Sequence, residues 1–172
     1  YRALNSTSFK LLTLKIPTVC AITGHAPAGG CILALMCDYR IMSEGRKWIG
    51  LNEIKLGLNI PLLAQQALFM TCDEYAAREM AYTGNFLGPE RALKVGLVDE
   101  VLPEEDLMQA ALRKVKSIGS SYIPAFGAIK ETRVSTLRKI FEEGKERDER
   151  TFMELWFNEE VRTNLKEAMA KF

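Results

Sequence analysis

Thr23-Gly24-His25-Ala26-Pro27-Ala28-Gly29-Gly30-Cys31 joins an apolar, β-branched run that begins at Val19 to a helix-compatible run, 32–36. A turn of small residues between a strand and a helix gathers free backbone N–H groups at the start of the helix. Those groups, reinforced by the helix dipole, suit an anion or a developing oxyanion, and glycine lets a ligand approach the main chain closely. The stretch therefore predicts α/β structure with an anion- or oxyanion-binding turn.

A second informative segment follows about twenty residues later and reads Gly50-Leu51-Asn52-Glu53-Ile54-Lys55-Leu56-Gly57. Glu53 is the single carboxylate on this otherwise apolar loop between glycines, which makes it a candidate general base. A lone glutamate in a loop is more often a solvated surface residue. Asn52 either orients that base by hydrogen bonding or shapes the turn, and both interpretations stay open.

Composition restricts the class of protein. The chain of 172 residues, with 48% hydrophobic and 26% charged residues, predicts one soluble globular domain with an appendage. A net charge of +1 without a basic stripe predicts neither a nucleic-acid partner nor a membrane partner. The four cysteines form no C-x-x-C pair and there is one histidine, so no metal site is expected and the cysteines are interpreted as reduced core residues.

Hydrophobic periodicity and helix-capping residues predict alternating strands and helices. After an amphipathic segment at 8–14, strands are expected at 18–23, 39–43, 48–51 and 98–102, and helices at 28–36, 61–70, 74–82 and 89–95. Asp73 and Asn158 are expected to cap helices, and Pro103 to open one. From about Ser117 onward the pattern is helical to the end of the chain. This order predicts a layered α/β core followed by a helical region.

Three motifs resemble the crotonase (enoyl-CoA hydratase/isomerase) superfamily. They are Ala28-Gly29-Gly30-Cys31, Cys37-Asp38-Tyr39-Arg40-Ile41 and Glu53-Ile54-Lys55-Leu56-Gly57, and the likeness continues through 88–101. The resemblance implies an α/β fold, the ClpP-like spiral of ββα units, with a helical C-terminal trimerisation region. Residues 1–116 would be the C-terminal portion of the spiral core and 117–172 the helical region. The N-terminal part of the fold, which carries another oxyanion donor in the family, is expected to be missing from this sequence.

Two departures from the hydratase pattern indicate which reaction to expect. Hydratases of the family carry a second glutamate where this chain has Ile32, and Leu58-Asn59-Ile60-Pro61-Leu62-Leu63 replaces their Pro-Gly-x-Gly-Gly run. The chain therefore resembles the mitochondrial-type Δ3,Δ2-enoyl-CoA isomerase subgroup of fatty acid β-oxidation. That resemblance implies that Glu53 is the catalytic base and that the Gly29 N–H polarises the thioester carbonyl. The residues implied to line the substrate site are Pro27, Ala28, Gly30, Ile32 and Asn52.

The resemblance also implies the ligand, the assembly and the compartment. The substrate would be an acyl-CoA thioester, with coenzyme A as part of the substrate and no other cofactor, and the protein a homotrimer or hexamer. The terminal Ala170-Lys171-Phe172 does not match a Ser-Lys-Leu signal, which favours a mitochondrial matrix or a bacterial cytoplasm. Lys166 and Lys171 are weak candidates for contacts with the phosphates of coenzyme A.

Alternatives remain for the reaction and for individual side chains. The chain could be another crotonase-type enzyme, that is a hydratase-like enzyme, an acyl-CoA hydrolase or a decarboxylase, or a non-catalytic acyl-CoA-binding subunit. His25 is tempting as an acid/base group, but the isomerase pattern does not require it. Asp38 and Arg40 could form a catalytic pair, although their place at a helix–strand junction favours a structural cap or salt bridge.

Overall fold

The computed structural model describes residues 1–169 and shows helices packed around two small parallel sheets. The strands are β1 (Val19–Ile22), β2 (Ala26–Pro27), β3 (Tyr39–Ser43), β4 (Ile49–Gly50) and β5 (Glu100–Leu102). The helices are α1 (Arg2–Leu12), α2 (Gly29–Leu35), α3 (Leu62–Thr71), α4 (Glu74–Thr83), α5 (Pro89–Lys94), α6 (Glu104–Gly119), α7 (Ile123–Trp156) and α8 (Glu159–Met169), with a 3-10 helix, η1, at Glu53–Leu56.

The larger sheet has the order β1-β3-β5, and all its strands are parallel. Its apolar side chains enter two separate clusters. Ile41 of β3 packs with Leu107 and Ala111 of α6, whereas Met42 belongs to the main core with the central helices. Because neighbouring residues of a strand point to opposite faces, β3 is buried on both sides, as its apolar sequence requires.

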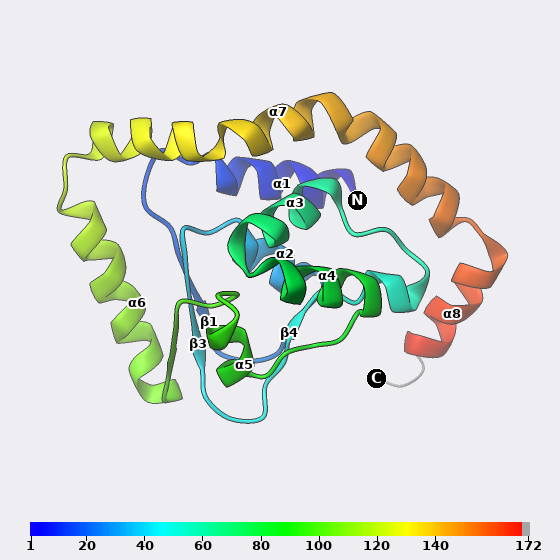
Figure 1. The fold of residues 1–172 in the computed structure, drawn as a ribbon, viewed down its shortest axis with the longest axis horizontal. Coiled ribbons are helices and arrows are strands. Elements are labelled where there is room, and N and C mark those ends of the chain that lie inside the picture. Colours follow the sequence, from blue (N-terminus) through cyan, green and yellow to red (C-terminus); the bar gives the residue numbers. More distant parts are fainter. Residues whose placement is uncertain (170–172) are drawn as a thin grey trace.

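Three C-terminal helices run along three sides of the molecule (Figure 1). In that view α6 lies on the left, α7 crosses the top above α1 and α3, and α8 descends on the right. The smaller sheet, β2 with β4, lies inside this arrangement beside α2, with which both strands are in contact. The helical region therefore covers the α/β part of the same chain.

A buried ion pair holds α7 against the larger sheet. The Lys130 ammonium lies 2.7 Å from the Asp38 carboxylate, and the two side chains are only 4% and 9% exposed. Asp38 also accepts hydrogen bonds from the backbone N–H and the hydroxyl of Thr18, each at 2.9 Å. Arg40 instead pairs with Asp99 at 3.1 Å. The structural interpretation of Asp38 and Arg40 is confirmed, although they pair with other residues and not with each other.

The helix starts agree with the expectations in most cases. The Asp73 carboxylate accepts the Ala76 N–H at 2.8 Å, and the Asn158 side chain accepts the Glu160 N–H at 2.9 Å. Pro89 begins α5, but Pro61 and Pro103 sit one residue before their helices, where their fixed φ of −51° still fits.

The helical tail consists of α7 and α8, which are separated at Phe157 and Asn158. Position 116 lies inside α6, so the division into 1–116 and 117–172 stays a prediction. The terminal 170–172, and with them Lys171, lie outside the described residues.

Candidate active site

The glycine turn and the Glu53 segment leave the same end of the β2/β4 pair. Ala26 pairs with Ile49 and Pro27 with Gly50 in parallel register, and the Ala28 N–H donates to the Gly50 carbonyl at 2.8 Å. Each strand is then followed within three residues by its candidate catalytic residue, Gly29 or Glu53. The parallel pairing therefore brings together two motifs that are about twenty residues apart in the sequence.

Free N–H groups stand at the start of α2. The first turn of this helix closes with the Ile32 N–H donating to the Ala28 carbonyl at 2.8 Å, so the N–H groups of Gly29 and Gly30 precede the intrahelical bonds. Among the described residues, apart from its chain neighbours and the backbone of α2 itself, no heavy atom lies within 4 Å of where a Gly29 side chain would begin. A Cβ at Gly30 would instead lie 3.3 Å from the Ala26 Cβ. Gly29 faces open space, whereas Gly30 allows close packing in the turn.

Ala28 has an unusual backbone at this turn. Its φ is +44° and its ψ is −110°, and it is the only non-glycine residue with a positive φ in the part of the chain that the structure describes. Such conformations cost about 1–3 kcal/mol and cluster at functional sites. Sequence reasoning named Ala28 as a substrate-site residue but had no signal for this strain.

Glu53 is the first residue of η1 and is 7% exposed. Its Oε2 atom is buried and has no hydrogen-bond partner within residues 1–169. Burial raises the pKa of the Glu53 carboxyl, while hydrogen bonds from the backbone N–H groups of Glu53 and Asn52 oppose that rise. A buried carboxylate with one free oxygen is available to exchange a proton with a ligand.

The buried thiol of Cys31, on α2, lies near Glu53. Burial is the main cause that raises the pKa of this thiol, and the charge of Glu53 adds to the effect. Cys31 is therefore an uncharged residue of the main core at the start of α2.

Two other helices enclose the Glu53 segment. Gly57 ends η1 with a φ of +77°, and a Cβ there would lie 2.8 Å from the Val161 side chain of α8. A Cβ at Gly84, the residue after α4, would lie 3.0 Å from Ile54 and Lys55. The Leu58 N–H donates to the Glu53 carbonyl at 2.9 Å. Glu53 is therefore held in a short helix that α4 and α8 confine.

The remaining predicted residues take different places. The buried Asn52 Oδ1 has no partner among the described residues, so no hydrogen bond from this side-chain oxygen orients Glu53. Ile32 is 2% exposed and belongs to the main core, whereas Pro27 is exposed on β2. His25 is exposed, and its Nδ1 accepts the Trp48 N–H at 3.2 Å. Their roles toward a substrate stay predictions.

A groove of about 880 Å³ lies between α1 and α7. Its apolar lining comes from Phe9, Phe141 and Met153, and charged residues surround them. Neither Gly29 nor Glu53 lines it. Across residues 1–169, no three His, Cys, Asp or Glu side chains are arranged to hold a metal ion, and no helix combines the length and hydropathy that a membrane span needs.

Comparison with known proteins identifies the family. The profile of the enoyl-CoA hydratase/isomerase family matches residues 2–172. Enoyl-CoA delta isomerase 1, mitochondrial, of Rattus norvegicus is 40% identical over 112 residues, which are 64% of this chain and 39% of that protein. A probable enoyl-CoA hydratase of Rhizobium meliloti is 33% identical over 156 residues, or 91% of this chain and 59% of that protein.

The solved structures agree with this result. Human mitochondrial delta3-delta2-enoyl-CoA isomerase superposes with a TM-score of 0.94 at 29% identity, covering 98% of this chain and 66% of that one. The architecture is thus that of a crotonase-fold protein. The chain belongs to the enoyl-CoA hydratase/isomerase family, and it spans about two fifths of the length of the curated isomerases it matches.

Proposed function

We propose that the protein moves the double bond of a 3-enoyl-CoA to the 2,3 position by a one-carboxylate 1,3-proton shift. One observation supports this most directly. The buried Glu53 keeps a carboxylate oxygen free beside the glycine turn, and Ile32 occupies the position where hydratases of the family carry a second carboxylate. The likeness to isomerases among the curated relatives adds support.

The proposed reaction begins when ionised Glu53 accepts a proton from C2 of the substrate. The electron pair of the broken C–H bond forms the C1–C2 double bond of a dienolate, whose negative charge lies on the thioester oxygen. The Gly29 N–H donates to that oxygen, with a second N–H expected from residues outside this sequence. Glu53 then returns the proton to C4, the double bond forms between C2 and C3, and the carboxylate is regenerated.

The burial of Glu53 serves both proton transfers. A raised pKa makes the carboxylate a stronger base toward C2, and protonated Glu53 is then a suitable acid for C4. General-base catalysis contributes about 10² to 10⁴ in rate, and an oxyanion donor about 3 to 4 kcal/mol of barrier. One carboxylate suffices because C2 and C4 lie on the same face of the bound substrate.

Ile32 contributes to this proposal by being apolar. Adding water across a double bond needs two groups to hold and activate one water molecule, and an aliphatic side chain supplies neither a base nor an acid. Coenzyme A enters as part of the substrate, and the reaction needs no other cofactor. Fatty acid β-oxidation in a mitochondrial matrix or a bacterial cytoplasm is the proposed setting, because relatives come from mitochondria and from bacteria.

The second candidate is hydration, since the sequence match to a probable hydratase covers 91% of this chain and the match to the rat isomerase 64%. The test incubates the full-length protein with a 3-enoyl-CoA and separately with a 2-enoyl-CoA. We expect a 2-enoyl-CoA from the first and little 3-hydroxyacyl-CoA from the second. Release of free thiol would instead indicate a hydrolase, and binding without turnover an acyl-CoA-binding subunit.

A further inference from the structure

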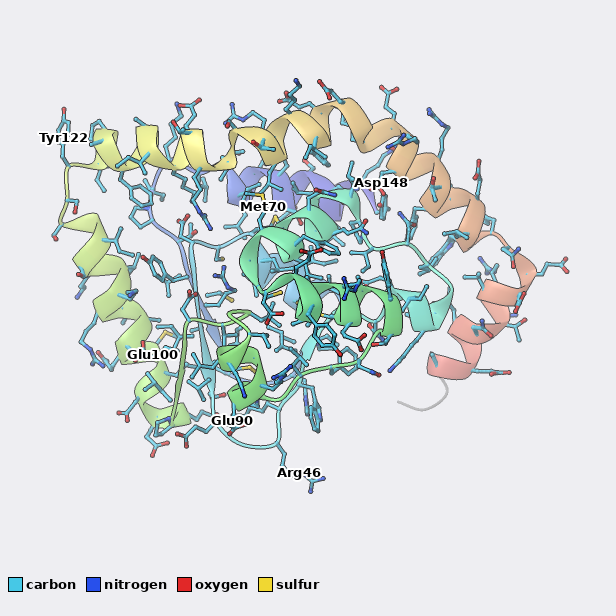
Figure 2. The ribbon with its side chains drawn as sticks, in the orientation of Figure 1. Arg46, Met70, Glu90, Glu100, Tyr122 and Asp148 are labelled. Carbon is cyan, nitrogen blue, oxygen red and sulfur yellow. The ribbon has the colours of Figure 1, made fainter. Side chains whose placement is uncertain are left out.

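Asp148 of α7 joins three segments that are far apart in the sequence. Its Oδ2 accepts the Tyr1 hydroxyl at 2.5 Å and the Leu62 N–H at 3.1 Å, and its Oδ1 accepts from the Asn59 side-chain amide at 2.9 Å. Asp148 lies on the side of α7 that faces the body of the protein (Figure 2). One half-buried carboxylate thus holds α1, the loop after η1 and the start of α3 together.

The contacts of Asp148 lead directly to the Glu53 segment. Asn59 follows Leu58, whose N–H donates to the Glu53 carbonyl at 2.9 Å. On the other side of the loop, Leu62 contacts α7 where Gly144 has no side chain, because a Cβ there would clash with the Leu62 side chain. The loop between η1 and α3 is therefore held at both ends, near Glu53 by Leu58 and near α7 by Asp148.

We propose that Asp148 is a positioning residue for the Glu53 carboxylate and acts through Asn59 and the loop 57–62. This inference rests on the proposed role of Glu53 as the base. The contacts of Asp148 are to Tyr1, Asn59 and Leu62 and not to Glu53, so the proposed influence is carried by the position of the loop. Misplacing a catalytic group by about 1 Å can cost about 10²-fold in rate.

The hydrogen-bond pattern suggests a breaking variant and a conservative one. Asp148→Leu removes all three acceptor contacts and keeps the branching at Cγ, although its side chain is larger. Asp148→Asn keeps one oxygen for Tyr1 and Leu62, and its new NH₂ group can donate to the Asn59 Oδ1 once that amide rotates. The described structure leaves this Oδ1 buried without a partner, so an acceptor is available.

An exchange of the two side chains gives a sharper variant pair. Asn59→Asp places two carboxylates against each other and should loosen the loop. The double variant Asn59→Asp with Asp148→Asn again has one amide donor and one carboxylate acceptor, so the hydrogen bond between residues 59 and 148 can form in the opposite direction. Glu143→Gln is the matched control, because Glu143 lies on the same helix, has a side chain that is 67% exposed, and forms an exposed pair with Lys139.

The experiment measures isomerisation by the full-length protein and amide hydrogen exchange in parallel. Asp148→Leu should lower kcat about 10- to 100-fold and change KM less than about threefold. Its acid limb in kcat/KM should move to lower pH, because a loosened loop admits water to Glu53 and lowers its pKa. The Leu58 and Leu62 amides should exchange faster, while β3 amides stay as in the wild type. Asp148→Asn and the exchanged pair should recover most of the lost kcat.

The outcomes separate this inference from the proposed function. Unchanged exchange at Leu58 and Leu62 in Asp148→Leu would overturn the positioning role, whatever the activity. The positioning role would also be overturned if Asp148→Leu left the acid limb of the kcat/KM profile unchanged and altered kcat and KM by the same factor. A wild type that does not isomerise 3-enoyl-CoA would overturn the proposed function, and unchanged loop exchange would still decide against Asp148.

Discussion

At the residue scale, the position of Glu53 separates it from an ordinary surface glutamate. It combines 7% exposure with a carboxylate oxygen that has no partner among the described residues. Buried polar atoms in folded proteins almost always have a hydrogen-bond partner, so an exception is a place to look for a ligand. Gly29 follows the strand paired with the one before Glu53, and the space beside it is open. Its backbone N–H is therefore accessible to the negative charge that proton abstraction would create.

Glu53→Gln keeps the size of the side chain but cannot accept a proton from C2. We expect turnover of a 3-enoyl-CoA to fall at least about 10²-fold, while acyl-CoA still binds. Steady-state kinetics and calorimetric titration measure the two effects. Glu105→Gln, at an exposed position on α6, is the control that should retain activity. Near-normal isomerisation by Glu53→Gln would remove Glu53 from the mechanism.

The raised pKa of Glu53 predicts opposite pH trends for activity and stability. Activity needs the ionised base, so the acid limb of kcat/KM should lie above the ordinary value of 4.5. When the pKa of a group is higher in the folded than in the unfolded state, its protonation stabilises the fold. This stabilisation is lost as the pH rises through the folded-state pKa. The free energy of unfolding of the wild type, relative to Glu53→Gln, should therefore fall as pH rises from 4.5 upward. Urea unfolding of both proteins over this range checks the sign, and a rising difference contradicts it.

Ile32→Glu tests whether the missing second carboxylate decides the reaction. Ile32 is 2% exposed, so a glutamate there raises its own pKa and costs about 1–3 kcal/mol of stability without abolishing the fold. We expect lower isomerase activity and trace hydration of a 2-enoyl-CoA, measured as 3-hydroxyacyl-CoA. Ile32→Gln is the matched variant, which should lose isomerase activity without gaining hydration. Hydration by the wild type as fast as its isomerisation would show that Ile32 is not the discriminator.

At the element scale, α7 packs Val134, Leu137 and Phe141 into the main core and adds polar contacts on either side of them. Lys130 reaches the sheet through Asp38, and Asp148 reaches the catalytic loop through Asn59. These two contacts are eighteen residues apart on the same helix. Together they fix the position of α7 along the protein, and therefore also that of α8, whose Val161 meets Gly57.

Lys130→Met removes the nearer cation of the buried Asp38 and leaves only the more distant Arg133 guanidinium, 4.0 Å away, among the described residues. Losing one partner of a buried pair costs about 3–5 kcal/mol, and the two hydrogen bonds from Thr18 place our expectation near about 3 kcal/mol. Lys139→Met, in an exposed pair with Glu143, should cost about 0.5 kcal/mol or less. Urea unfolding of both variants measures the difference, and equal losses would contradict a stabilising role for the Lys130–Asp38 pair.

Local rules predicted much of the fold and of the candidate site from the sequence, but they could not predict contacts between distant segments. Asp73 and Asn158 cap helices through nearby N–H groups, so the pattern alone identifies them. The strand 39–43 was predicted with both of its ends correct. Lys130 and Asp148 look like other charges on a solvated helix, because only the tertiary fold shows that they are buried or bridging. The strain at Ala28 depends on the pairing of β2 with β4, which is also non-local.

At the scale of the whole molecule, α8 is docked within its own chain. The apolar stripe of α8 is too narrow to form a core by itself, so this helix needs a surface to dock on. Val161 is 6% exposed and packs at Gly57, so the chain itself supplies part of that surface. The expectation of assembly therefore has to rest on other parts of the molecule.

The outer end of α7 provides such a surface. Tyr122 is 76% exposed at the turn between α6 and α7, where Figure 2 labels it, and Ile129 is 70% exposed further along the helix. Large apolar side chains left in water at one end of the molecule favour association. Together with the family resemblance, they lead us to propose a homotrimer, or a hexamer built as a dimer of trimers, for the full-length protein.

Ile129→Glu tests this assembly directly. A charge at a position buried between copies should shift the full-length protein from trimer toward monomer, because the carboxylate loses hydration without gaining a partner. Light scattering after size-exclusion chromatography measures the mass, with Lys139→Glu as a charge-changing control elsewhere on α7. Glu53 and Gly29 lie away from Ile129 in the sequence and are held by elements other than the first turns of α7. The monomeric variant should therefore lose activity only to the extent that it loses stability. A wild type that is a monomer at micromolar concentration, with full activity, would contradict the proposed assembly.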